Sequence, residues 1–390
     1  MLILIALFFY EYNAKLIKNQ ATKWGENNMN KRLIIIISVV LILSSILCSC
    51  APKQEVITEQ KTEAATEKIP STRVITDMAG RIHEINLEIT KVFATNPVGT
   101  TLVYTLSPDK LLGWNYQFND LELAFIADEY KDLPVYGTIK NANYEALISA
   151  GPDIIISAAG VDEKTASKID KFQDQLGIPI IMVDESLINS EEAYSFLGEV
   201  LNEQEKAKKL SDYAKKVLNS ISSNNMPEEN SVSIYFGNGI NSLNTSSRGT
   251  PPSESFDLLG ALNVCNLQGD SPDRIEVTPE HIIEWNPDYI FINGEPTEDI
   301  SSTSAVKSIL ENESYKNINA VKKGKVINIP NTPFAWLDRP RSSNRLLGLQ
   351  WAGSIIYPDY FEFSSDDVKE FYSLFYHIDI TDVDIEELFN

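Results

Sequence analysis

The amino-acid sequence predicts an α/β protein with two lobes of similar design joined by one long helix. Three observations lead to this prediction: short apolar strands alternate with helical segments, one motif occurs in each half, and a proline-free helical stretch separates the halves. Strand–helix alternation is typical of a mostly parallel sheet covered by helices. The chain has 390 residues, which is long enough for two domains.

We predict the first lobe over residues 73–190. It begins with a hairpin in which Gly80 lies in the turn between two short strands. Apolar segments and helical patterns alternate after the hairpin. The predicted strands are residues 74–76, 82–85, 92–94, 111–114, 154–157 and 180–183, and the predicted helices are residues 100–106, 144–149 and 163–176.

Residues 191–225 are predicted to form the connecting helix. The segment from 191 to 221 has no proline and one glycine, Gly198, and its apolar residues recur at helical spacing. A continuous helix of this length would span about 45 Å, and a break near residues 198–202 is the alternative. The second lobe is predicted over residues 226–390, with strands at 231–236, 289–292 and 326–329.

An internal repeat supports the two-lobe prediction. Glu145 is followed after seven residues by Pro152-Asp153 and an apolar strand, and Glu280 is followed at the same spacing by Pro287-Asp288 and another apolar strand. Each copy is typical of a short helix that stops at Pro-Asp and leads into a buried strand.

The charge and the motif content exclude several classes of protein. The formal net charge is −22, and a polyanion of this size repels phosphate backbones, so we expect no nucleic-acid partner. Cys265 is the single cysteine after the N-terminal segment, which excludes a disulfide framework and a multi-cysteine metal site. We find no motif of nucleophilic, metal-dependent or phosphate-transfer catalysis, and therefore expect no enzyme.

The N-terminal segment resembles a bacterial lipoprotein signal. Residues 30–32 are Asn-Lys-Arg, and an apolar run ends in Leu-Cys-Ser-Cys at Cys50. We expect residues 29–49 to be the signal peptide, Cys50 to carry the lipid that anchors the protein to the membrane, and residues 50–72 to be a flexible tether. Residues 1–28 fit a mis-annotated upstream extension with translation starting at Met29. An uncleaved signal anchor is the alternative.

The motifs together resemble those of ABC-importer binding proteins for ferric siderophores, haem and cobalamin. The resemblance covers roughly residues 73–390, and it rests on Thr-Asp-Met-Ala-Gly-Arg at 76–81, the two Pro-Asp repeats, Trp-Leu-Asp-Arg-Pro-Arg at 336–341 and Tyr-Pro at 357–358. It implies two Rossmann-like lobes with a ligand cleft between them. It also implies an extracytoplasmic protein that delivers its ligand to a permease dimer with its ATPase, with Glu145 and Glu280 as the docking carboxylates.

The resemblance places the ligand at the carboxyl ends of the strands, where open α/β sheets bind small molecules. Aromatic rings would stack on a flat ligand, and cationic side chains would bind its carboxylates. Arg339 occupies a position where relatives carry a ligand-facing arginine, whereas Trp351 is predicted to be a core residue. The candidate ligand-binding residues are Trp114, Tyr116, Lys140, Asn238, Arg248, Trp336, Arg339 and Arg341.

The cargo is expected to be a metal chelate, namely a ferric siderophore, haem or a corrinoid, with no resident cofactor. Direct metal coordination by the protein is not expected, because His83, His281 and His377 lie outside the predicted cleft loops. Two alternatives stay open. One is a protein of the same fold that binds an oxyanion such as molybdate or tungstate, and the other is a lipoprotein that acts as a sensor or adhesin without transport.

Overall fold

The computed structural model describes residues 71–223, 232–268, 271, 273–294 and 303–389. Residues 1–28, the predicted signal peptide, Cys50 and most of the predicted tether lie outside the described residues. Residues Lys68–Asn390 belong to one compact unit, and the domain boundaries predicted within it stay predictions. No helix in the described part of the chain is long and apolar enough to cross a membrane.

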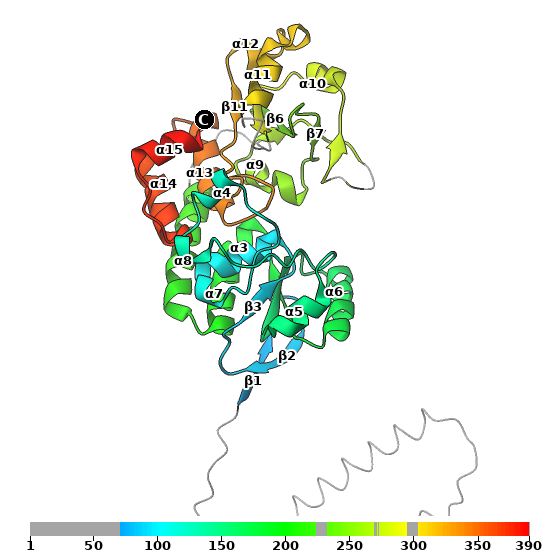
Figure 1. Ribbon diagram of the computed structural model, residues 1–390. Coiled ribbons are helices and arrows are strands. Elements are labelled where there is room, and N and C mark those ends of the chain that lie inside the picture. The colour runs from blue at the N-terminus through cyan, green and yellow to red at the C-terminus, as the bar shows by residue number, and fades with distance from the viewer. Residues whose placement is uncertain (1–70, 224–231, 269–270, 272, 295–302, 390) are drawn as a thin grey trace, which may run out of the picture. The chain divides into compact units, whose positions relative to one another are not determined.

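The first half of this unit is built on a sheet of three parallel strands in the order β3-β4-β5 (Figure 1). All three residues of β3 are buried, as are the first five of β4, because helices cover the sheet. The strands are β3 Val92–Ala94, β4 Ile154–Ala159 and β5 Ile180–Asp184. The helices are α3 Pro97–Leu106, η1 Pro108–Lys110, α4 Asp120–Leu123, η2 Asp128–Tyr130, α5 Tyr144–Ala150, α6 Glu163–Leu176, η3 Leu187–Asn189 and α7 Ser190–Leu201.

One predicted strand of this half does not form. Leu111 makes an isolated parallel bridge to Val92, and Trp114 makes another to Val135, so residues 111–114 contribute two bridges rather than a strand. Their apolar side chains face the core, and burial of this kind gives the same sequence signal as a strand.

The hairpin of β1 (Thr72–Thr76) and β2 (Ile82–Asn86) is fastened to the first sheet through Asp77. The Asp77 side chain is fully buried and accepts hydrogen bonds from the Arg81 guanidinium at 2.8 Å, from the Met182 backbone at 3.0 Å and, at 3.1 Å, from His83 Nε2. Met182 lies in β5. The motif at residues 76–81 therefore has a structural role: its aspartate joins the hairpin turn to the edge strand.

The second half is built on a six-stranded sheet in the order β11-β10-β6-β7-β9, with β8 paired to β6. β11, β10, β6 and β8 are parallel, whereas β7 is antiparallel to both of its neighbours. The strands are β6 Ser233–Asn238, β7 Asn244–Thr245, β8 Leu262–Asn263, β9 Ile275–Glu276, β10 Tyr289–Asn293 and β11 Val326–Asn328.

Helices cover this sheet and continue beyond it to the C-terminus (Figure 1). They are η4 Pro251–Ser253, α9 Glu254–Leu258, α10 Pro279–Trp285, α11 Ser304–Glu311, η5 Glu313–Tyr315, α12 Asn319–Lys322, α13 Asn344–Ile356, α14 Ser365–Phe371, the π-helical η6 Tyr372–Tyr376 and α15 Asp382–Leu388. Trp351 on α13 is 5% exposed, which confirms its prediction as a core residue.

The prediction of one continuous connecting helix is wrong. α7 ends at Leu201, Asn202 adopts a left-handed φ of 58°, and α8 runs separately over Gln204–Ser223. The two helices pack closely at Gly198, where an added Cβ would lie 2.3 Å from the Cβ of Ala207. The break at Asn202 lies within residues 198–202, the alternative given from the sequence, although the apolar spacing continues through both helices because each buries a face.

The structure confirms the internal repeat and gives its physical basis. α5 ends at Gly151 (φ 65°) before Pro-Asp and β4, and α10 ends at Asn286 (φ 43°) before Pro-Asp and β10. The aspartate of each copy then accepts a backbone hydrogen bond from a neighbouring segment. Asp153 binds the N–H of Lys91 at 2.9 Å, and Asp288 binds the N–H of Ser233 at 3.2 Å. Each half thus contains the same helix–strand unit.

Candidate functional site

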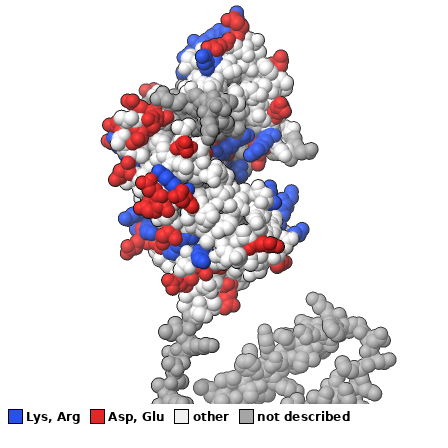
Figure 2. Space-filling view, viewed as in Figure 1, with Lys and Arg blue, Asp and Glu red and all other residues white. Residues whose placement is uncertain are grey.

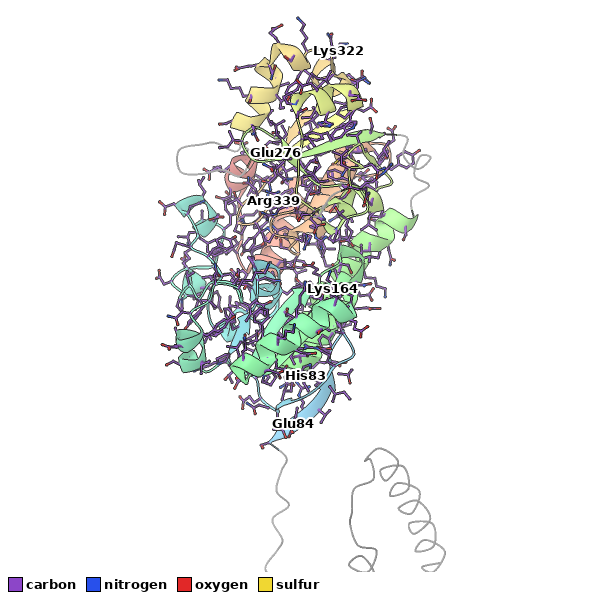
Figure 3. The ribbon with its side chains drawn as sticks, turned by 90° about the vertical axis from the view of Figure 1, so that its right-hand side faces the viewer. His83, Glu84, Lys164, Glu276, Lys322 and Arg339 are labelled. Carbon is purple, nitrogen blue, oxygen red and sulfur yellow. The ribbon has the colours of Figure 1, made fainter. Side chains whose placement is uncertain are left out.

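A cavity of about 920 Å³ lies between the two halves. The first half contributes the start of α3, Tyr116 and the N-terminal part of α6. The second half contributes Pro252, Ser271, Asp273, Arg274 and residues 338–341. Figure 3 labels Lys164 on α6 of the first half and Arg339 on the second half. The volume is in the range of small-molecule sites, roughly 300–1,000 Å³.

The cavity is positively charged although the chain is strongly acidic. Its basic lining residues outnumber its acidic ones by five to two, whereas the whole chain has a net charge of −22. Figure 2 shows Lys and Arg gathered in the hollow at the middle of the molecule. The basic residues are Lys164, Lys168, Arg274, Arg339 and Arg341, and the acidic ones are Asp273 and Asp338. This arrangement favours an anionic ligand.

α6 places two of the cations side by side. Asp162 caps the helix by accepting a hydrogen bond from the N–H of Thr165 at 3.0 Å. The cap fixes the start of α6 shortly after β4. Lys164 and Lys168 are four residues apart and therefore lie on one face of the helix. Both side chains are exposed and form no ion pair with any described residue.

The loop after β11 supplies the arginines in a constrained backbone. Arg339 adopts φ 67°, which is uncommon for a residue other than glycine and costs on the order of 1 kcal/mol. The preceding Asp338 is 5% exposed, and its carboxylate lies 3.8 Å from Nε of Arg339. Burial raises the pKa of Asp338, and Arg341 and Arg339 oppose that rise.

A buried network of charges lies behind the arginine loop. Arg341 Nη2 is 2.8 Å from Oε1 of Glu185, which directly follows β5. Arg345 Nη2 donates to the backbone carbonyl of Glu185 at 2.5 Å, and its Nη1 donates to Glu254 Oε2 at 2.7 Å. Burial raises the pKa of Glu185, opposed by Arg341 and Arg345. The network ties the end of the first sheet to the second half.

Three of the eight predicted ligand-binding residues line the cavity: Tyr116, Arg339 and Arg341. Lys140 and Arg248 are exposed and lie outside its lining. Asn238, at the end of β6, is fully buried, and its side-chain oxygen and nitrogen have no hydrogen-bond partner among the described residues. It too lies outside the lining.

The prediction that two tryptophans contact the ligand is wrong. Trp114 is 2% exposed, and its Nε1 donates to the backbone carbonyl of Tyr130 at 2.9 Å. Trp336 is fully buried and packs edge-on against Trp351, with ring centroids 5.9 Å apart. Both rings fill the core beneath the loops that carry them, because burying a large apolar ring stabilises the fold more than leaving it exposed to solvent.

Five charged residues of the lining were not predicted from the sequence: Lys164, Lys168, Asp273, Arg274 and Asp338. The two lysines carried a usable signal, since they occupy the first turns of a predicted helix that follows the carboxyl end of a predicted strand. Arg274 carried none, because residues 271–274 have no periodic pattern.

Glu145 and Glu280 occupy equivalent positions in the repeat. Each lies in the first turn of its helix, α5 and α10 respectively, and both residues are exposed. Hydrogen bonding to Thr278 lowers the pKa of Glu280. The docking role of the two carboxylates stays a prediction.

The histidines take part in local hydrogen bonds. His83 contacts Asp77, Nδ1 of His281 accepts the Thr278 N–H at 3.2 Å, and Nε2 of His377 lies 3.2 Å from the Tyr104 carbonyl. Within the described ranges, no group of three or more His, Cys, Asp or Glu side chains is arranged to hold a metal ion.

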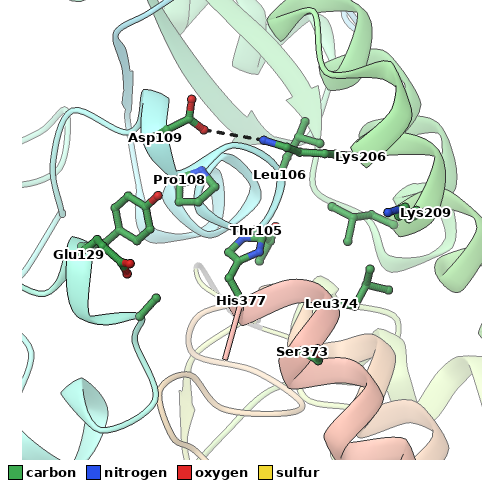
Figure 4. Close-up of a pocket in the computed structure, with 13 residues that line it drawn as sticks. Thr105, Leu106, Pro108, Asp109, Glu129, Lys206, Lys209, Ser373, Leu374 and His377 are labelled. Carbon is green, nitrogen blue, oxygen red and sulfur yellow. Dashed lines mark ion pairs between the residues drawn. The ribbon is translucent and has the colours of Figure 1, made fainter. Parts of the chain in front are cut away.

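A second cavity of about 450 Å³ lies among α3, α8 and η6, and it shares no lining residue with the first (Figure 4). Its charges are balanced, with Lys206 and Lys209 facing Asp109 and Glu129, and Asp109 lies 3.9 Å from Lys206. The second cavity contains none of the predicted ligand-binding residues. The cationic cavity is therefore the candidate functional site.

Two α/β halves with a cationic cavity between them define a solute-binding protein. Residues 114–333, more than half of the chain, match the family model of the periplasmic binding proteins. The chain belongs to the periplasmic binding protein family.

Relatives and solved structures agree with this assignment. The uncharacterized ABC transporter substrate-binding lipoprotein YvrC of Bacillus subtilis is 26% identical over 78% of this chain and 91% of its own length. The molybdate-binding protein MolA of Haemophilus influenzae is 23% identical over 68% and 77%. An ABC transporter solute-binding protein from Sulfurospirillum deleyianum superposes with a TM-score of 0.72 at 26% identity, over 81% of this chain and 99% of that one.

Proposed function

We propose that this protein is the extracytoplasmic substrate-binding component of an ABC importer, and that its cargo is an anionic metal chelate of the ferric siderophore, haem or corrinoid class. The observation that carries the proposal is the cavity of about 920 Å³, in which basic residues outnumber acidic ones. The protein binds its cargo and releases it unchanged.

The size of the cavity favours a chelate over a bare oxyanion. A tetrahedral oxyanion has the size of a few water molecules and would occupy only a small part of the cavity. A chelate would reach cations on both halves at once, from Lys164 and Lys168 on α6 to Arg339 and Arg341 in the loop after β11. Tyr116 offers an aromatic face in the same cavity.

The proposed partner is a permease dimer with its ATPase. Glu145 and Glu280, one from each copy of the repeat, would each pair with a cationic group on one permease subunit. Such exposed charge pairs set register and the rate of association more than affinity. A lipid on Cys50 would keep the protein at the outer surface of the membrane.

A titration panel tests the proposal. Purified protein is titrated by calorimetry with ferric siderophores, ferric citrate, haem, cobalamin and molybdate. We expect saturable binding of one chelate class, with an affinity that falls as salt rises because the cavity is cationic. Binding of molybdate alone would overturn the chelate assignment in favour of the oxyanion alternative.

A transport assay separates import from a sensor or adhesin role. The protein is reconstituted with a candidate ABC permease and its ATPase from the same genome, and uptake of the bound chelate is measured. We expect uptake that requires ATP and this protein. Chelate binding without uptake would contradict the importer assignment.

A further inference from the structure

Glu185 reaches across the junction of the two halves to a cavity-lining arginine. It follows β5 of the first sheet, and Arg341 follows β11 of the second. Glu185 Oε1 lies 2.8 Å from Arg341 Nη2, with the side chains 14% and 23% exposed. Arg341 is thus both a wall of the cavity and half of an ion pair that is mostly shielded from water.

The neighbouring charges leave Glu185 committed to Arg341. Arg345, the other arginine that contacts Glu185, uses its Nη1 for Glu254 and only its Nη2 for the Glu185 backbone carbonyl. The Glu254 carboxylate also accepts the backbone N–H groups of Leu187 and Ile188, at 2.8 Å and 3.2 Å. Arg345 is therefore paired with Glu254. Arg341 is paired with Glu185, and it also interacts electrostatically with the buried Asp338 carboxylate.

This ion pair affects which anions the cavity binds. A small oxyanion bound at Arg341 would share the guanidinium with the Glu185 carboxylate, and two anions on one guanidinium in a shielded site repel each other. An extended anion avoids the conflict, because its other charges reach Lys164 and Lys168, which have no ion pair within the described ranges. A repulsive group of this kind gives specificity by weakening the wrong complex.

We propose that Glu185 is a specificity-determining residue: by occupying Arg341 it disfavours small oxyanions and leaves the cavity selective for extended polyanions. The inference rests on the proposed function, since it assigns a selectivity to the same cavity. It also explains why a cavity that favours anions has an acidic side chain paired with one of its arginines.

The substitution Glu185→Gln tests this inference. It removes the charge and keeps an oxygen that can accept a hydrogen bond from Arg341, so we expect the variant to remain folded. With molybdate and phosphate as probes in calorimetry, we expect the variant to bind at least about tenfold more tightly than the wild type, the scale of one charged hydrogen bond. Glu185→Asp keeps the charge and should bind these probes no more tightly than the wild type.

Two control variants show whether a gain in oxyanion affinity depends on the Glu185–Arg341 pair. Glu191→Gln removes the same charge from α7, where Glu191 pairs with Lys215 at 2.9 Å, and it should leave oxyanion affinity unchanged. Arg341→Met removes the partner of Glu185, so adding Glu185→Gln to it should bring no further gain. The inference is overturned if Glu185→Gln binds oxyanions no more tightly than the wild type, or if Glu191→Gln produces the same gain.

The result is distinguishable from that of the function test. If no chelate binds the wild type and Glu185→Gln still gains oxyanion affinity, the chelate assignment fails and the role of Glu185 stands. If a chelate binds and Glu185→Gln leaves oxyanion binding unchanged, the role of Glu185 fails and the chelate assignment stands.

Discussion

Arg345 and Glu254 form a buried ion pair in which Nη1 of the arginine lies 2.7 Å from Oε2 of the carboxylate. The Arg345 side chain is 3% exposed, and Glu254 also binds the backbone of η3. The pair therefore joins α13 and α9 of the second half to the segment that follows the first sheet.

Replacing one partner of this pair should be costly. Arg345→Met leaves the Glu254 carboxylate without its cation, and we expect the free energy of unfolding to fall by about 3–5 kcal/mol in a urea titration. The double variant Arg345→Met/Glu254→Gln should lose less than the single variant, because no buried charge is left unpaired. An equal loss in both would show that the loss comes from the missing Arg345 contacts and not from an unpaired Glu254 carboxylate.

Asp77 should make the stability depend on pH in the acid range. Burial alone would raise its pKa, but hydrogen bonds from His83, the Met182 backbone and Arg81 lower the pKa from the ordinary 3.8 to about 2. Because the folded-state pKa is depressed, this contribution is present above pH 3.8 and is lost as the pH falls toward about 2.

The substitution Asp77→Asn should remove that contribution, about 2 kcal/mol, at neutral pH. Thermal unfolding followed by circular dichroism across the acid range measures both effects. Asp170→Asn is the matched control, since Asp170 also binds Arg81 at 2.8 Å but is 53% exposed. It should change the stability by less than about 1 kcal/mol. A wild-type and an Asp77→Asn protein with the same acid profile would contradict the prediction.

Gly198 is required where α7 and α8 cross. An alanine usually stabilises a helix relative to glycine by about 1 kcal/mol, but here its Cβ would lie 2.3 Å from the Cβ of Ala207. We expect Gly198→Ala to lower the free energy of unfolding by about 1–3 kcal/mol, the cost of overpacking. Adding Ala207→Gly should restore part of it. A stabilised Gly198→Ala protein would mean that the helices separate at little cost.

The docking prediction is tested by charge reversal. The double variant Glu145→Arg/Glu280→Arg should abolish uptake in the reconstituted transporter and leave chelate affinity intact, because neither residue lines the cavity. Glu205→Arg/Glu311→Arg is the control, with the same charge change at exposed positions of α8 and α11. Loss of chelate affinity in the first variant would show that the carboxylates are not docking contacts.

Arg339 should contribute directly to the binding of an anionic ligand. Arg339→Ala is expected to weaken that ligand by ~1–3 kcal/mol, the scale of a charged hydrogen bond, and to reduce the salt dependence of binding. Arg248→Ala removes the same charge from an exposed position outside the cavity lining and should have no effect. Unchanged affinity in Arg339→Ala would remove this residue from the site.

Local sequence patterns were sufficient for most of the regular elements. The helix over residues 163–176 was predicted with the observed bounds because its apolar residues follow one face between the capping Asp162 and Gly177. The Pro-Asp repeat was equally informative, since the same helix stop and the same strand follow in both halves. The prediction of a strand at residues 111–114 was wrong, because a buried apolar segment that does not pair in a sheet has the same sequence pattern as a strand.

The sequence by itself determined the α/β class, the repeated unit and the two arginines of the loop after β11. Only the tertiary structure decided which side chains meet in the cavity. Lys164 and Arg274 come together because the two halves face each other, whereas Trp114 and Trp336 turn inward to fill the core. The physical reason is that secondary structure follows local periodicity, while a cavity is formed by contacts between segments that are distant in the chain.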